Sequence, residues 1–327
     1  ETALMCDMHV SSKLGLVKFD LLGLTTLDII KITCELIKEN HGIDIDPYAI
    51  PFDDPKTFAL LQTGNTCRVF QAEGDGFTNM MKGLVPTEFE HIIAMNALYR
   101  PGALAYDEAI KMSAAEKYIR TKNGLMPPTK IDPCIDDVLA PTHYMMLFQE
   151  QIMEIARRVA GYTMAEADHL RKVIGKKLVK EIDDEGDKFV RCSIASGKSK
   201  EFAEYIFGLI KPSARYLWNR AHSAAYGVIT YITAYLKANY PVEFMCANLI
   251  MTDSDQHKVI IDDCKKLGIK ISRPDINKSK LSFSASGSTI YIGLSSIKGV
   301  GETSAKGFIK ERELNGPYIH FADFITR

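Results

Sequence analysis

The sequence has no excess of charge, because 40 Lys and Arg residues nearly balance 41 Asp and Glu residues and leave a formal net charge of -1 over 327 residues. A neutral total provides no overall field that would attract the chain to nucleic acid or to a membrane. Any such partner must therefore be bound by a local cluster of charge. The hydrophobic (46%) and charged (25%) fractions are ordinary for a globular protein and exclude a disordered or collagen-like chain.

Cysteine is sparse and scattered. The seven cysteines are odd in number and form no Cys-x-x-Cys pair, which favours a reducing compartment and argues against a disulfide framework or a structural zinc site. The most apolar stretch, residues 228–236, is ended by Lys237 and is far shorter than the roughly 20 residues of a membrane-spanning helix. We therefore expect a cytoplasmic protein without a membrane partner.

Several catalytic motifs are also missing, including His-Glu-x-x-His, Gly-x-Ser-x-Gly and the Walker phosphate-binding loop. The first ten residues contain acids and lack the basic and apolar regions of a signal peptide. Because the sequence begins without Met and stops without a tail, we expect it to be a segment of a longer protein. Its length reaches the range of about 250–300 residues at which single cores stop growing, so two or more structural units are expected.

The hydrophobic pattern predicts a mainly α fold with small β elements (α+β). Residues 16–20 alternate like a strand, and helical spacing begins at Thr25 or Thr26 and ends near Gly42. A linker is expected over 43–56, and mostly helices follow to about residue 250. Within that stretch we expect a loop over 118–133, where Gly124 and a Pro-Pro pair break regular structure.

Three helices of the central region have clear signals. One is predicted over 148–161, a second begins at a Thr163–Glu166 capping box and ends at Gly175, and a third, strongly apolar, covers 226–236. After about residue 255, short strands are expected at 269–274, 281–283 and 289–292, followed by a short helix to Ile309.

The segment Lys298-Gly299-Val300-Gly301 lies where a loop enters a predicted helix. Glycines there allow backbone N–H groups and the positive helix end to approach a phosphate, as helix-hairpin-helix modules do on a nucleic-acid backbone. A tight turn before an ordinary helix accounts for the same residues, so both interpretations stay open.

A basic cluster lies at and just beyond the C-terminus of the second predicted helix. Its members are Arg171, Lys172, Lys176, Lys177 and Lys180. Cations at a helix C-terminus complement the macrodipole, but five within ten residues exceed that need and predict an anion site, with a polyphosphate as the natural ligand.

Lys18 and Asp20 fall on one face of the expected strand, about 6.6 Å apart by strand rise. An Asp can hold a divalent metal while a Lys neutralises a phosphate, which is the pairing that nucleotidyl transfer needs. A solvated strand face would show the same pattern.

A polar cluster precedes the apolar helix and includes His222 and Tyr226, whose ring offers a flat face to a base or sugar. An ordinary helix cap with polar neighbours is the alternative. Arg100 lies in a Tyr-Arg-Pro-Gly turn and is a further candidate for phosphate contact.

These segments together resemble the alpha subunit of bacterial DNA polymerase III, the C-family replicative polymerases, in its DnaE-type branch. The matching stretches occur in the family's order and cover nearly the whole chain: LGLVKFDLLGL (14–24), VFQAEGDG (69–76), NALYRPGAL (96–104), 148–177, 219–247 and GLSSIKGVGE (293–302). The resemblance implies the C-terminal end of the palm with its last catalytic strand over 1–24, a helical fingers domain over 25–255, and a small β segment with a truncated helix-hairpin-helix region over 256–327.

The resemblance also implies roles for single residues. Asp20 matches a metal-binding aspartate and Lys18 the active-site lysine, while Arg171 and Lys172 match a basic pair that meets the incoming triphosphate. His222 and Tyr226 match the segment beside the nucleotide. Gly299 and Gly301 match the hairpin that contacts duplex DNA.

The implied activity is template-directed nucleotidyl transfer from a dNTP to a primer 3′-hydroxyl by a two-metal mechanism with Mg²⁺. The implied partners are primer-template DNA, dNTP and, in the full-length protein, the sliding clamp and other replisome subunits, in the nucleoid of a bacterium or from a phage gene. Two alternatives stay open, a non-catalytic DNA-binding module and an error-prone, repair-type member of the same family. Because a single Asp cannot hold two metals, we expect the isolated chain to be inactive.

The sequence departs from the family pattern at several positions. Gly74 and Ala221 stand where the family usually has Ser, Trp218 where Phe is common, and Lys172 where a second Arg is more frequent. Lys lacks the bidentate fork of Arg, so the grip on phosphate is expected to be looser at Lys172.

Overall fold

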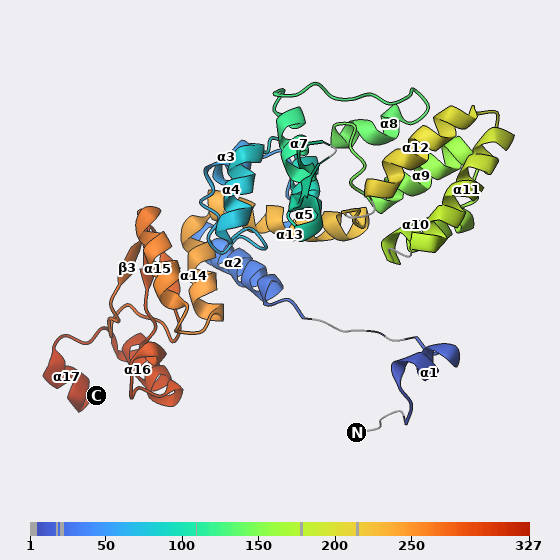
Figure 1. Cartoon of the computed structure of the whole chain (residues 1–327). Coiled ribbons are helices and arrows are strands. Elements are labelled where there is room, and N and C mark those ends of the chain that lie inside the picture. The colour runs from blue at the N-terminus through green and yellow to red at the C-terminus, as the bar shows by residue number, and fades with distance from the viewer. Residues whose placement is uncertain (1–4, 18, 20–22, 109, 177–178, 214–215) are drawn as a thin grey trace.

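The computed structural model describes residues 5–17, 19, 23–108, 110–176, 179–213 and 216–327. Helices dominate the chain and the sheets are small (Figure 1), which confirms the mainly α prediction. The first half contains α1 (Met8–Lys13), α2 (Thr25–His41), η1 (Pro47–Ala49), α3 (Pro55–Thr63), α4 (Asp75–Leu84), α5 (Phe89–Leu98), α6 (Pro101–Leu104), β1 (Tyr106–Asp107), β2 (Met112–Ser113), α7 (Ala114–Lys122), α8 (Asp136–Leu139), η2 (Ala140–Thr142) and α9 (Gln149–Ala160). The second half contains α10 (Met164–Lys176), α11 (Val179–Ala195), α12 (Lys200–Ser213), α13 (Arg220–Asn239), α14 (Pro241–Met251), α15 (His257–Lys266), β3 (Lys270–Ser272), β4 (Ser284–Ser286), β5 (Thr289–Tyr291), η3 (Leu294–Ser296), α16 (Glu302–Asn315) and α17 (Phe321–Thr326).

Two hydrophobic cores divide the helices into lobes. The first lobe, which we call lobe A, consists of α2–α7, α13–α15 and the small sheet of β3, β4 and β5, packed around the first core. The second, lobe B, is built from α8–α12. Figure 1 shows the elongated result, with α9–α12 at one end, α16 and α17 at the other, and lobe A between them.

Helix α13 is the axis of lobe A. It packs against α5, α3 and α14, and its C-terminal half buries the side chains of Tyr231 and Leu236 completely. Lys237 is also fully buried, where its Nζ donates to Asp263 Oδ2 and to the carbonyl oxygen of Cys67, both at 2.7 Å. A buried ammonium is tolerated because both contacts compensate its lost hydration.

Helix boundaries largely follow the sequence signals. The capping box of α10 is present, since Thr163 Oγ1 accepts from the N–H of Glu166 and Glu166 Oε2 accepts from the N–H of Thr163. Helix α10 ends one residue beyond the predicted Gly175. In the described part of the chain, no helix is both long and apolar enough to cross a bilayer.

The strand predicted over 16–20 is wrong for its described residues, because 16, 17 and 19 lie in no strand. The side chains of Val17 and Phe19 are 72% and 81% exposed. A strand needs a hydrogen-bonded neighbour, and among the described residues none pairs with this segment. Lys18 and Asp20 themselves lie outside the described residues.

Two other boundaries differ from prediction. The loop expected from residue 118 starts only after α7, because Ser113 caps that helix through its Oγ and Tyr118 is buried in lobe A. The second short strand forms at 284–286 rather than 281–283, because Gly287 at φ 56° closes a tight turn that pairs Ser286 with Thr289.

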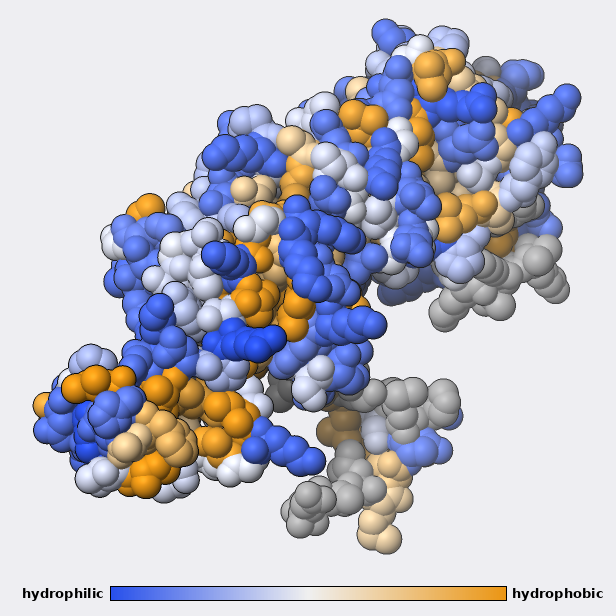
Figure 2. Space-filling view, turned by 90° about the vertical axis from the view of Figure 1, so that its left-hand side faces the viewer, coloured by the Kyte–Doolittle hydropathy of each residue, from blue (hydrophilic) through white to orange (hydrophobic). Residues whose placement is uncertain are grey.

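The C-terminal unit of α16 and α17 buries few residues. Figure 2 shows apolar side chains over this unit, at the lower left of that view. Ile319, Phe321 and Ile325 are among its exposed apolar residues.

We expect Asp263→Ala to lower the free energy of unfolding by about 3–5 kcal/mol, because it leaves the Lys237 ammonium buried without its counter-ion. Urea denaturation of the chain measures this. The neighbouring Asp262→Ala is the control, since its exposed pair with Lys265 contributes about 0–1 kcal/mol. If a Lys237→Met/Asp263→Leu double variant is no more stable than Asp263→Ala, unpaired charge is not the cause of the loss.

Candidate functional site

The N-terminal half of α13 presents a column of aromatic rings. His222 and Tyr226 are spaced four residues apart, which places them on one side of the helix, and Trp218 lies just before its first turn. The rings of His222 and Tyr226 stack at 4.4 Å, and Trp218 meets His222 edge-on at 5.3 Å. The helix starts cleanly at this point because Asn219 Oδ1 accepts from the N–H of His222 at 2.7 Å.

A pocket of about 330 Å³ opens beside this column. Its other walls come from the loop before α4 and the end of α5. The lining residues are Gln71, Phe77, Asn96, Tyr99, Arg100, Trp218, His222 and Tyr226. Three residues selected from the sequence, Arg100, His222 and Tyr226, therefore meet in one pocket.

Arg100 acts as a structural link in this pocket. Its Nε and Nη2 donate to the carbonyl oxygen of Ala97, and Nη2 also donates to that of Tyr216. The guanidinium carbon lies 4.1 Å from the ring centroid of Trp218, a cation–π distance, and burial lowers the pKa of Arg100. These contacts hold Trp218 at the end of the aromatic column, so Arg100 positions the pocket wall.

The basic pair lies in lobe B, on α10. Arg171 Nε and Lys172 Nζ each approach a different oxygen of Asp168 at 2.8 Å, and these two contacts lower the pKa of that carboxyl group. One carboxylate thus balances only half of the positive charge of the pair. Arg171 keeps 30% of its side chain exposed and Lys172 58%, so both remain open to an anion.

A chain of hydrogen bonds connects the basic pair to the aromatic column. Arg171 Nη1 donates to Gln149 Oε1 at 3.3 Å, and the N–H of Gln149 donates to the carbonyl oxygen of Trp218 at 2.8 Å. The N–H of Trp218 in turn donates to the carbonyl oxygen of Leu147 at 3.0 Å. The two backbone hydrogen bonds of Trp218, which we call the lobe junction, hold the start of α9 against the start of α13.

Acidic residues at the lobe junction were not selected from the sequence. Both carboxylate oxygens of Glu150 accept from the N–H of Arg220 at 2.9 Å, and Glu90 Oε1 accepts from Arg220 Nη2 at 2.6 Å. The carboxylate of Glu150 therefore complements the positive end of α13. Glu150 stands in the mostly polar Phe-Gln-Glu-Gln run at 148–151, which marks it as a candidate. The sequence does not indicate its partner, because Arg220 lies 70 residues away.

The remaining predicted residues fall in other places. Lys176 is the last residue of α10, and Lys177, Lys18 and Asp20 lie outside the described residues. Lys298, Gly299 and Gly301 are exposed in the turn before α16, far from the aromatic pocket in Figure 1. Gly299 has φ 91°, and no described side chain caps the N-terminus of α16.

Two family models match parts of the chain. A family model of the bacterial DNA polymerase III alpha subunit finger domain matches residues 26–197, and a helix-hairpin-helix model matches residues 268–327. The chain is 41% identical to DNA polymerase III subunit alpha of Thermus aquaticus over 98% of its length, and 41% identical to that of Aquifex aeolicus over 100%. It spans 26% and 28% of those two proteins, about a quarter of their length.

We expect Arg100→Met to shift the fluorescence emission of Trp218 to longer wavelength and to lower the free energy of unfolding by about 1–3 kcal/mol. The carbonyl groups of Ala97 and Tyr216 lose their donor, and the ring loses the cation that covers it. Trp218 is the only tryptophan of the sequence, so its emission reports on this pocket alone. Arg120→Met, which removes a surface ion pair with Glu116, should leave the emission unchanged; an unshifted Arg100→Met spectrum would contradict the positioning role.

Proposed function

This chain belongs to the family of bacterial DNA polymerase III alpha subunits, and from that membership we propose that it is the nucleotide-binding fingers region of a DNA-directed DNA polymerase. The parent enzyme would extend a primer by nucleotidyl transfer from deoxynucleoside triphosphates. The observation that supports this most directly is the hydrogen-bonded connection from Arg171 through Gln149 to Trp218. It joins a phosphate-binding pair to an aromatic pocket, the two parts that a nucleoside triphosphate needs.

The proposed division of labour follows the chemistry of the side chains. Tyr226 and His222 would offer flat faces to the base and sugar of the nucleotide. Arg171 and Lys172 would neutralise the triphosphate, with Lys176 and Lys177 extending the positive surface. Because Asp168 already contacts both members of the pair, a phosphate would have to displace or share those contacts.

The metal requirement concerns residues outside this pocket. No group of three or more His, Cys, Asp or Glu among the described residues is placed to hold a metal ion. Asp20, the proposed ligand for Mg²⁺, would supply one carboxylate, and Lys18 is the proposed active-site lysine. We expect further carboxylates from the rest of the parent protein; Mg²⁺ bound there would stabilise the charge that develops on the transferred phosphate. Association with a sliding clamp and a replisome also remains a prediction for the parent protein, as does its cytoplasmic location.

Primer extension by the full-length parent tests this proposal. An Arg171→Gln/Lys172→Gln double variant should raise the KM for dNTP by at least about 100-fold, because two charge-assisted contacts are lost and each is worth about 1.5–3 kcal/mol. The matched control is Arg157→Gln/Arg158→Gln on α9, another adjacent basic pair that shares one acid, Glu154. Equal effects of the two double variants would contradict a phosphate role for α10.

The same assay separates nucleotide binding from chemistry. Asp20→Asn should abolish extension while the affinity for primer-template DNA stays nearly unchanged, because a metal ligand is lost and no DNA contact is removed. Synthesis that survives this substitution would remove Asp20 from the active site.

A second function, binding of the duplex backbone, is favoured by the turn before α16. The first turn of α16 has no side-chain cap, and Gly299 and Gly301 leave its N–H groups open to a phosphate. Lys298 is exposed beside them and makes no ion pair within the described chain.

We expect Lys298→Ala to weaken binding of duplex DNA regardless of its sequence and to reduce the slope of log affinity against log salt by about 1. Fluorescence anisotropy at several salt concentrations measures both. Lys306→Ala is the control, because Lys306 is neutralised by Glu302 at 2.6 Å. A salt slope that does not change in Lys298→Ala would rule out this phosphate contact.

A further inference from the structure

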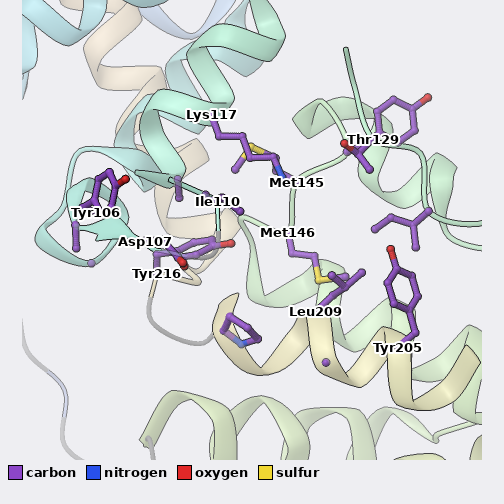
Figure 3. Close-up of a pocket in the computed structure, with 17 residues that line it drawn as sticks. Tyr106, Asp107, Ile110, Lys117, Thr129, Met145, Met146, Tyr205, Leu209 and Tyr216 are labelled. Carbon is purple, nitrogen blue, oxygen red and sulfur yellow. The ribbon is translucent and has the colours of Figure 1, made fainter. Parts of the chain in front are cut away.

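A second pocket, of about 350 Å³, lies between lobe A and lobe B (Figure 3), and its lining residues differ from those of the aromatic pocket. Lobe A contributes α6, the β1–β2 hairpin and the start of α7, and lobe B contributes α12. The segment 144–146 passes between them, with Met145 packed in the first core and Met146 in the second. The volume falls in the range of small-molecule sites.

The walls of this interlobe pocket are aromatic and apolar. Four tyrosines, Tyr106, Tyr144, Tyr205 and Tyr216, surround it together with the thioethers of Met145 and Met146. Tyrosine rings pack well against flat ligands, and methionine adapts to their outline. Burial, followed by the nearby charge of Asp107, raises the pKa of Tyr216 to about 12, so its hydroxyl remains a neutral donor at physiological pH.

Lys117 extends into the interlobe pocket from α7. Figure 3 shows the Lys117 side chain directed toward Met145, and its ammonium forms no ion pair with any residue that the structure describes. Other cations of α7 are engaged, because Arg120 pairs with Glu116 and Lys122 donates to carbonyl oxygens before α5. Asp107 lies beside Tyr216, and Lys130 Nζ lies 6.0 Å from the ring centroid of Tyr144. Lys117 is the cation among the described residues that line the pocket.

We propose that the interlobe pocket binds a planar aromatic molecule that carries one anionic group. The aromatic body lies among the tyrosine and methionine side chains, and the anion contacts Lys117. Because both lobes line the pocket, such a ligand contacts the two cores at once. The site is separate from the nucleotide pocket, and the proposal does not depend on the polymerase assignment.

The test uses 8-anilinonaphthalene-1-sulfonate, an aromatic sulfonate, as the probe. The 327-residue chain is labelled with ¹³C at the methionine methyl groups and titrated with this probe. We expect saturable shifts of the Met145 and Met146 methyl signals, which are assigned with Met145→Leu and Met146→Leu. Fluorescence of the probe without these shifts would mean that it binds other apolar surface, and would overturn the proposal.

Two variants identify the pocket as the origin of the shifts. Gly208 lines it from α12, and a Cβ there would meet no atom within 4 Å, so Gly208→Leu should fill the space without a clash. We expect this variant to keep its melting temperature, because glycine is a poor residue within a helix, and to lose the methyl shifts at probe concentrations that saturate the unsubstituted chain. Lys117→Met should weaken binding by about tenfold, the loss of one charge-assisted contact.

Arg120→Met is the matched control, since it removes a cation from the same helix outside the pocket. It should bind the probe as the unsubstituted chain does. Methyl shifts that persist unchanged in both Gly208→Leu and Lys117→Met would overturn the proposal, and so would an equal loss of affinity in Arg120→Met.

Discussion

The lobe junction is the contact on which the arrangement of the chain depends. Two backbone hydrogen bonds join Trp218 to Leu147 and Gln149, and they connect segments that are about 70 residues apart in the sequence. Each lobe has its own hydrophobic core, and at this point the pairing, together with the contact of Glu150 with the N–H of Arg220, joins one lobe to the other. The pairing fixes the start of α9 and the start of α13 together, and with them the basic pair of lobe B and the aromatic column of lobe A.

The junction also explains why polar groups are concentrated around it. The second half of helix α13 is apolar and its first half is polar. The N-terminus of the helix, which carries the positive end of its dipole, therefore lies where the two lobes meet. Glu150 from lobe B and Arg100 from lobe A satisfy backbone groups on either side of Trp218. The same side chains therefore stabilise the junction and shape the pocket, which is why substitutions there are expected to affect both stability and binding.

Sequence reasoning was most successful for helices with strong local signals. The span of α2, the capping box of α10 and the apolar half of α13 are all encoded within a few residues, because caps and hydrophobic spacing act locally. It failed for residues 16, 17 and 19 and for the start of the loop after α7. A strand depends on a neighbouring strand, and the helical state of 118–122 depends on the burial of Tyr118 in lobe A; neither is a local property.

For the candidate site too, the sequence predicted the local features and not the contacts between distant segments. His222, Tyr226, Arg171 and Lys172 were selected from their residue types and from the family resemblance, and family membership is confirmed by the comparisons. That Arg100 binds the Trp218 ring and the carbonyl group of Tyr216, and that Glu150 contacts the end of α13, could not be predicted, because these partners come from different elements. The contacts of Asp168 with the basic pair, by contrast, lie within α10 at three- and four-residue spacing. The sequence by itself determined the family and the helical fold, and it indicated candidate residues for contact with a nucleotide. Only the tertiary structure decided which of them meet and which are occupied by neighbouring groups, because hydrogen bonds and ion pairs depend on distances between segments that the order of residues does not specify.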